Sequence, residues 1–177
     1  MKNLVFYDTE FLEDGRTIEL ISIGMVDNTG HEFYAVNQEA PWERISQHPW
    51  LYDNVVPYLP RLHGLAVSSP LVNPCAIDFS DPCLMSKIDI ARLVQNFLWG
   101  VDELWADYAA YDHVALAQLF GTMTDLPRGT PMFTHELQQL WETAGKPPKP
   151  ANSGEHHPLN DARYGMALYQ RCCGGTP

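Results

Sequence analysis

The segment Leu4-Val5-Phe6-Tyr7-Asp8-Thr9-Glu10 joins a short apolar run to two carboxylates. Aliphatic and aromatic residues of this kind favour extended backbone, so residues 4–7 are predicted to form a β-strand. Because residues i and i+2 of a strand point to the same face, Asp8 and Glu10 would present their carboxylates together at the strand's end. Two solvated turn acids would give the same pattern. The segment alone therefore leaves a metal site and a polar strand end both open.

The rest of the chain predicts strands and helices in an order typical of an α/β protein. Residues 17–26 and 32–36 continue the first strand as a meander, and residues 103–106 form a further strand. Apolar spacing and capping signals predict helices over residues 88–98, 112–120, 134–144 and 158–172. We therefore expect one domain over residues 1–177, an α/β fold with a mixed sheet flanked by helices.

Residues 41–85 interrupt this pattern. Seven prolines between Pro41 and Pro82 make long helices unfavourable, since proline lacks a backbone N–H and clashes with the preceding turn. We expect an irregular insertion here, with short helical pieces near residues 42–46 and 52–58. Residues 173–177 are predicted to be a frayed tail.

Composition and charge restrict the function. The net charge of −11 argues against a protein that coats nucleic acid through a basic surface. It still allows an enzyme that admits one strand end into a metal-loaded cleft. No apolar run approaches the roughly 20 residues of a membrane-spanning helix, so no membrane association is expected. The four cysteines form no CxxC pair, which disfavours a zinc site and predicts a reduced, cytoplasmic protein.

Two further segments carry chemistry. Asp112 opens a predicted helix, where it could act as a helix cap or as a metal ligand, and Asp107 is a competing acid five residues earlier. Near the C-terminus, His156 precedes Asp161 by five residues, and the intervening proline suits the first turn of a helix. His157 is the alternative histidine. Several carboxylates and one histidine suit a hydrolase in which hard divalent cations bind oxygen ligands and the histidine takes a proton from water.

The three segments together resemble the DEDD exonucleases of the ribonuclease H-like superfamily, in the subgroup that has a catalytic histidine. The motifs of that family are Asp-x-Glu, a central Asp before a helix, and His-x4-Asp. They match Asp8-Thr9-Glu10, Asp112 and the pair His156 and Asp161, in order and over nearly the whole chain. The flanking residues are similar to the small mycobacterial and phage 3′-5′ exoribonucleases related to ribonuclease T.

This resemblance implies a ribonuclease H-like fold and a two-metal site. The implied ligands of two Mg²⁺ ions, with Mn²⁺ as a substitute, are Asp8, Glu10, Asp112 and Asp161. His156 is implied as the general base, so activity should fall at acid pH, because histidine ordinarily titrates near about pH 6.5. The residues implied to lie beside the terminal nucleotide are Thr9, Phe11 and Leu12.

The implied activity is 3′-5′ removal of nucleoside 5′-monophosphates from single-stranded RNA or 3′ overhangs, by a homodimer. Within enzymes, a single-stranded DNA exonuclease or an oligoribonuclease-like enzyme is the alternative. A non-catalytic binding module on the same fold is the alternative from another class. The acidic charge and the complete set of four acids and a histidine argue against that module.

Overall fold

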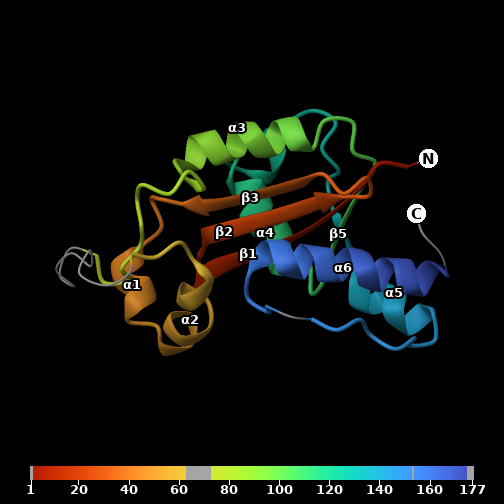
Figure 1. Cartoon of the computed structure of the whole chain (residues 1–177). Helices are drawn as coiled ribbons and strands as arrows, with labels where there is room; N and C mark the ends of the chain where they lie inside the picture. Colours follow the sequence, from red (N-terminus) through yellow and green to blue (C-terminus); the bar gives the residue numbers. More distant parts are fainter. Residues whose placement is uncertain (1, 63–72, 153, 175–177) are drawn as a thin grey trace.

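The computed structural model describes residues 2–62, 73–152 and 154–174, which contain a six-stranded mixed sheet flanked by helices (Figure 1). The spatial order of the strands is β4-β3-β2-β1-β5-β6. The first three strands form the expected antiparallel meander, and β4, β5 and β6 each pair in parallel with a neighbour. The strands are β1 (Leu4–Glu13), β2 (Ile18–Asp27), β3 (Glu32–Asn37), β4 (Leu84–Met85), β5 (Glu103–Ala106) and β6 (Thr134–Glu136). This confirms the predicted α/β class and is consistent with a ribonuclease H-like arrangement.

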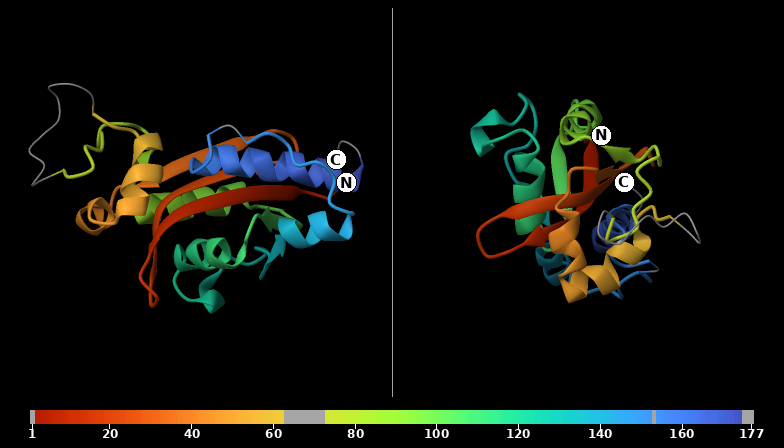
Figure 2. Two further views of the ribbon diagram at one scale, coloured as in Figure 1. Left: turned by 90° about the horizontal axis from the view of Figure 1, so that it is seen from below. Right: turned by 90° about the vertical axis from the view of Figure 1, so that its left-hand side faces the viewer.

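Helices cover both faces of the sheet and one of its ends. One face packs against α3 (Lys87–Phe97) and α4 (Ala110–Gln118). The opposite face packs against α5 (Leu137–Thr143) and α6 (Pro158–Cys173), as the two views of Figure 2 show. The end of the sheet away from the termini is covered by α1 (Trp42–Ser46), α2 (Pro49–Asn54) and the 3₁₀ turn η1 (Val56–Tyr58). Another 3₁₀ turn of the described residues, η3 (Met123–Asp125), follows α4.

The alternation of side chains along β1 decides which face each acid meets. Val5 and Tyr7 pack in the cluster beneath α3 and α4, whereas Leu4 and Phe6 pack in the cluster beneath α5 and α6. Continuing the period of two, the acids at positions 8 and 10 fall on the α6 face of the strand. The first residues of β1 therefore pack in the apolar core, and the acids that follow them lie in a polar site on the α6 face.

The pairing of β1 with β5 leaves part of β1 uncovered. Within the described residues, β5 pairs with Leu4–Phe6 only, and it ends at Ala106. On its other side β1 stays paired with β2 as far as Glu13, with a shift of register between Glu10 and Phe11. The acidic part of β1 therefore extends past the end of its parallel neighbour, and a pocket forms beside it.

Two short edge strands were not anticipated. Residues 134–144 were predicted to form one helix, but Thr134–Glu136 is strand β6, and α5 begins only at Leu137. The N-cap of α5 is Glu136, whose side chain accepts a hydrogen bond from the backbone of Gln138 at 3.0 Å. Parallel pairing with β5, in which Leu104 lies opposite Thr134, holds residues 134–136 in an extended conformation. This pairing overrides the local signals for a helix. Likewise, β4 lies inside the stretch predicted to be an irregular insertion.

Other boundaries agree with expectation or move by a turn. Strand β5 and helix α1 have the predicted bounds, and α3 begins after Ser86, whose hydroxyl accepts from the backbone of Asp89 at 3.2 Å. Helix α4 begins at Ala110, so Asp112 is not its cap. The last helix runs through Cys173, which was expected in the tail. Residues 63–72 of the insertion and 175–177 of the tail lie outside the described residues.

Two further features concern the cysteines and the lengths of the helices. All four cysteines are free, so none of them forms a disulfide. Among the helices in the described ranges, none is both long and apolar enough to cross a membrane.

Candidate active site

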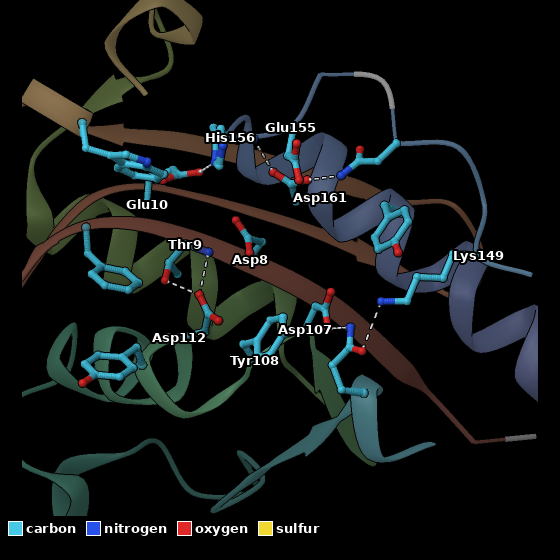
Figure 3. Close-up of a pocket in the computed structure, with 16 residues that line it drawn as sticks. Asp8, Thr9, Glu10, Asp107, Tyr108, Asp112, Lys149, Glu155, His156 and Asp161 are labelled. Atoms are coloured by element: carbon cyan, nitrogen blue, oxygen red, sulfur yellow. Dashed lines mark hydrogen bonds and ion pairs between the residues drawn. The ribbon is translucent and has the colours of Figure 1, made fainter. Parts of the chain in front are cut away.

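A cavity of about 510 Å³ lies beside the uncovered part of β1 (Figure 3). Its walls come from β1, from the residues after β5, from α4, and from α6 with the loop that precedes it. Six carboxylates line this cavity: Asp8, Glu10, Asp107, Asp112, Glu155 and Asp161. It is the place where the acids of the three sequence segments meet.

Three of these carboxylates converge most closely. One oxygen from each of Asp8, Glu10 and Asp161 lies within 4.8 Å of the others. The approach depends on Gly24, which lies opposite Asp8 in the register of β1 and β2. A Cβ atom at Gly24 would be 2.1 Å from the backbone nitrogen of Leu159, so the first turn of α6 rests directly on the sheet. That close packing brings Asp161 to the strand acids.

Asp112 lines the same cavity but stands outside this group of three. Its Oδ1 accepts hydrogen bonds from the backbone nitrogen of Thr9 at 2.9 Å and from the Thr9 hydroxyl at 2.5 Å. Both residues are buried, with Asp112 only 5% exposed. The contact fixes α4 against β1 and leaves Oδ2 of Asp112 without a hydrogen bond from the described protein.

Burial raises the pKa of all four acids, and repulsion within the group adds to the effect at Asp8 and Glu10. Burial, reinforced by Asp161 and Asp112, raises the pKa of Glu10 to about 9. Burial raises the pKa of Asp112 to about 6, against the lowering effect of its Thr9 hydrogen bonds. The pKa of Asp8 lies well above its ordinary value through burial and the neighbouring Asp112, and burial also raises the pKa of Asp161. Such a site strongly disfavours its own negative charge.

The donor set fits divalent cations. In the part of the chain that the structure describes, none of the four acids forms an ion pair with a lysine or arginine. The ligands on offer are all carboxylate oxygens, which hard cations such as Mg²⁺ and Mn²⁺ prefer. A bound dication would also offset the repulsion that contributes to the raised pKa of Asp8 and Glu10. The residues present therefore fit the binding of divalent cations.

His156 is the histidine that the fold brings to these acids. Its backbone nitrogen donates to Oδ2 of Asp161 at 2.9 Å, and its φ of 68° lies in the left-handed region. Its Nδ1 lies 4.0 Å from Oε1 of Glu10, and its ring meets Trp50 edge-on at 4.9 Å. A side-chain contact thus holds a strained backbone, as is frequent at functional sites.

His157 lies elsewhere. Its ring stacks on Tyr34 at 4.6 Å, and it does not line the cavity. Burial lowers its pKa, which favours the neutral ring. The two adjacent histidines, which the sequence left as alternatives, are therefore separated by the fold.

Aromatic rings form another wall of the cavity. Phe11 and Tyr111 lie nearly parallel, with ring centroids 5.8 Å apart and 11° between their planes. Tyr111 is 50% exposed. Leu12, which was expected beside a nucleotide, is instead 4% exposed and packs with Ile21 in the core beneath α1 and α2. That correction follows from the cover that α1 and α2 provide over this end of the sheet.

The sequence motifs did not predict several of the residues that line the cavity. Tyr111 adjoins Asp112 in the sequence, so an aromatic next to a motif acid was an available signal. Trp50 and Lys149 lie in proline-rich stretches and carried no recognisable pattern. Asp107, the competing acid, does line the cavity, where its Oδ1 accepts from Nε2 of Gln138 at 2.6 Å.

The mixed sheet with clustered carboxylates beside β1 is consistent with a nuclease of ribonuclease H-like architecture, and sequence relatives make the family definite. Two curated proteins, both named 3′-5′ exoribonuclease and from two strains of Mycobacterium tuberculosis, are each 44% identical to this chain over 161 residues. The match covers 89% of this chain and 86% of each relative. The chain belongs to this family of small mycobacterial-type 3′-5′ exoribonucleases. No protein-family model matches it.

Proposed function

We propose that the protein is a divalent-metal-dependent 3′-5′ exoribonuclease that releases nucleoside 5′-monophosphates from single-stranded RNA or 3′ overhangs. The observation that carries this proposal is the convergence of Asp8, Glu10 and Asp161 within 4.8 Å, in a chain of this family. The acidic surface, with a net charge of −11, suits an enzyme that takes one strand end rather than a duplex surface.

The metal ligands would be the three converging acids together with Asp112. Two Mg²⁺ ions, or Mn²⁺ in their place, would supply a water of lowered pKa and neutralise charge on the phosphate. The protein contributes the spacing of the acids, which α6 sets from one side and β1 from the other. Thr9 acts through Asp112, because its hydroxyl and backbone nitrogen both donate to that carboxylate.

His156 would act as the general base. It lies in the cavity wall, its backbone is held by Asp161, and its ring faces Glu10 across 4.0 Å. A neutral imidazole in this position could take a proton from the attacking water. Phe11 and Tyr111 would receive the terminal base by stacking, which accepts every base because each has a π-face.

The direct test is a gel time course on 5′-labelled single-stranded RNA and its DNA equivalent, with Mg²⁺, with Mn²⁺ and with EDTA. We expect a ladder that shortens from the 3′ end, is absent in EDTA, and proceeds faster on RNA. Equal or faster cleavage of DNA would favour the DNA exonuclease, and cleavage of very short strands alone would favour the oligoribonuclease-like enzyme. Metal binding without cleavage of any strand would favour the non-catalytic module.

We further propose that the chain acts as a single exonuclease domain, as a homodimer, in the cytoplasm. The family resemblance suggests the dimer, and four free cysteines suit a reducing compartment. Light scattering on the eluting protein tests the dimer, which should have twice the chain mass of 20.0 kDa. A monomeric mass at working concentration would contradict it.

A further inference from the structure

We propose that Lys149 binds the RNA phosphodiester that lies one nucleotide to the 5′ side of the scissile linkage. The inference rests on the proposed exoribonuclease function and assigns a phosphate subsite next to the acids. Lys149 lies in the loop between α5 and α6 and lines the cavity. Of the described residues around this cavity, it is the only lysine or arginine, beside six carboxylates.

The contacts of Lys149 hold its charge without neutralising it. Its Nζ donates to Oε1 of Gln138 at 3.1 Å and lies 4.5 Å from the ring centroid of Trp141. The other end of the Gln138 amide donates to Asp107 at 2.6 Å, which fixes the orientation of that amide. Among the described residues, Lys149 makes no ion pair with a carboxylate. An ammonium group that is oriented by neutral partners can accept an anion that arrives from solution.

The layout of the cavity gives the bound strand a direction. Figure 3 shows Glu10 and Lys149 toward opposite ends of the site, with Asp8 and Asp161 between them. Beyond Glu10, β1 continues to Phe11, which stacks with Tyr111. A strand whose terminal base lies on these rings, and whose scissile phosphate lies over the acids, continues toward Lys149. Its next phosphate then meets the ammonium group.

A purely structural role for Lys149, as a cation stacked on Trp141, is the competing explanation. The chain contains a matched control for it. Lys146 lies over the same ring at 5.2 Å, but its Nζ pairs with Glu142 at 2.8 Å and it does not line the cavity. If stacking on Trp141 were all that mattered, Lys149→Gln and Lys146→Gln would behave alike.

The experiment compares hydrolysis of a dinucleotide, which has only the scissile phosphate, with that of a trinucleotide, which has one more. We expect Lys149→Gln to raise KM about threefold to fivefold on the trinucleotide at low salt, and to leave the dinucleotide unchanged. On longer RNA the slope of log KM against log salt should fall by about 0.7, the value for one single-strand phosphate contact. Lys146→Gln should change neither, and Lys149→Arg should restore the trinucleotide KM.

A neutral methylphosphonate at the second linkage of the trinucleotide tests the same contact from the side of the substrate. With the wild-type protein, this analogue should raise KM by the same factor as Lys149→Gln does on the ordinary trinucleotide. The substitution and the analogue together should raise KM no further than either alone. An equal loss on the dinucleotide would overturn the proposal, because Lys149 would then act at the scissile phosphate. Equal KM values for Lys149→Gln and wild type on the trinucleotide would also overturn it.

Failure of the proposed function would give a different result, namely no hydrolysis of either oligonucleotide by wild type. In that case fluorescence anisotropy of the labelled trinucleotide in Ca²⁺ decides the phosphate subsite separately. Weaker binding by Lys149→Gln, with the methylphosphonate strand unaffected by that substitution, would support the subsite. Equal binding by wild type and variant would reject it.

Discussion

The backbone of Gly24 in β2 lies directly against the backbone of Leu159 in α6. A Cβ atom added at Gly24 would be 2.1 Å from the Leu159 nitrogen and 2.3 Å from the carbonyl carbon of Pro158. Gly24 is also the register partner of Asp8, and Asp161 lies in the same first turn of α6. A position without a side chain therefore sets the distance between the acids of two segments that are far apart in the sequence.

Gly24→Ala should displace α6 and weaken the metal site together. Because backbone atoms, rather than a flexible side chain, block the new methyl group, we expect a loss of about 1–3 kcal/mol in the free energy of unfolding. Mn²⁺ affinity should fall as well, as measured by calorimetry. Gly165→Ala, in α6 itself, is the control, since its Cβ would meet only the tip of Leu137 at 2.9 Å. Unchanged stability and affinity in Gly24→Ala would contradict this account of the packing.

Asp8→Asn and Asp161→Asn should abolish metal-dependent hydrolysis while the protein stays folded. Each change removes one oxygen ligand from the group of three but keeps the shape of the side chain. The rate of RNA shortening and the calorimetric Mn²⁺ affinity should both fall, by about 100-fold or more in rate. Asp53→Asn removes the same charge from an exposed position outside the cavity and should be silent. Full activity in either site variant would end the metal assignment.

The metal-free protein should become less stable as the pH rises. A carboxyl group whose pKa is higher in the folded than in the unfolded state stabilises the folded protein at low pH. That contribution is lost as the pH rises from the unfolded value through the folded one: from 4.5 to about 9 for Glu10, and from 3.8 to about 6 for Asp112. We expect Tm in EDTA to fall between about pH 5 and about pH 8, and divalent ions to raise Tm more at the higher pH.

Glu10→Gln separates this effect from general repulsion in an acidic chain. The variant keeps a side chain of similar size but has no carboxyl group to titrate, so its Tm in EDTA should depend less steeply on pH. The same slope in variant and wild type would show that the pocket acids are not responsible.

The adjacent histidines should differ sharply in function. His156→Gln should lower kcat by about 10²–10⁴-fold, the range for loss of a general base, with Mn²⁺ affinity retained. His157→Gln should keep kcat, because that ring stacks on Tyr34 away from the cavity, and should lower Tm instead. Single-turnover rates and melting curves for the two variants check both statements. Equal kcat values for the two variants would reject the assignment of the base.

Tyr111→Ala should raise KM for RNA with little effect on metal binding. Removal of one stacking ring should weaken the binding free energy of a base that lies on it by about 1–3 kcal/mol. Tyr58→Ala, at a residue that is 46% exposed outside the cavity, is the control for loss of a surface tyrosine. For a substrate whose last nucleotide lacks its base, wild type and Tyr111→Ala should have the same KM. If Tyr111→Ala leaves KM for ordinary RNA unchanged, the terminal base does not stack there.

Local sequence signals were sufficient to predict the elements that have a clear capping residue or a clear apolar run. Ser86 with Asp89 marked the start of α3, and the apolar run before Asp8 marked β1. They failed at β4 and β6, which are two and three residues long. Such pieces are too short to show periodicity, and they become strands because a neighbouring strand offers its hydrogen-bonding edge.

The sequence by itself determined the fold class and the candidate acids, because hydrophobic periodicity and the order of the motifs can be followed along the chain without knowledge of distant contacts. The family resemblance already favoured His156 over His157, but only the tertiary structure decided that Leu12 is core and that Lys149 lines the cavity with His156. Those outcomes depend on how α6 rests on Gly24 and on where β5 ends beside β1. Such contacts join residues that are far apart in the chain, so no local pattern specifies them.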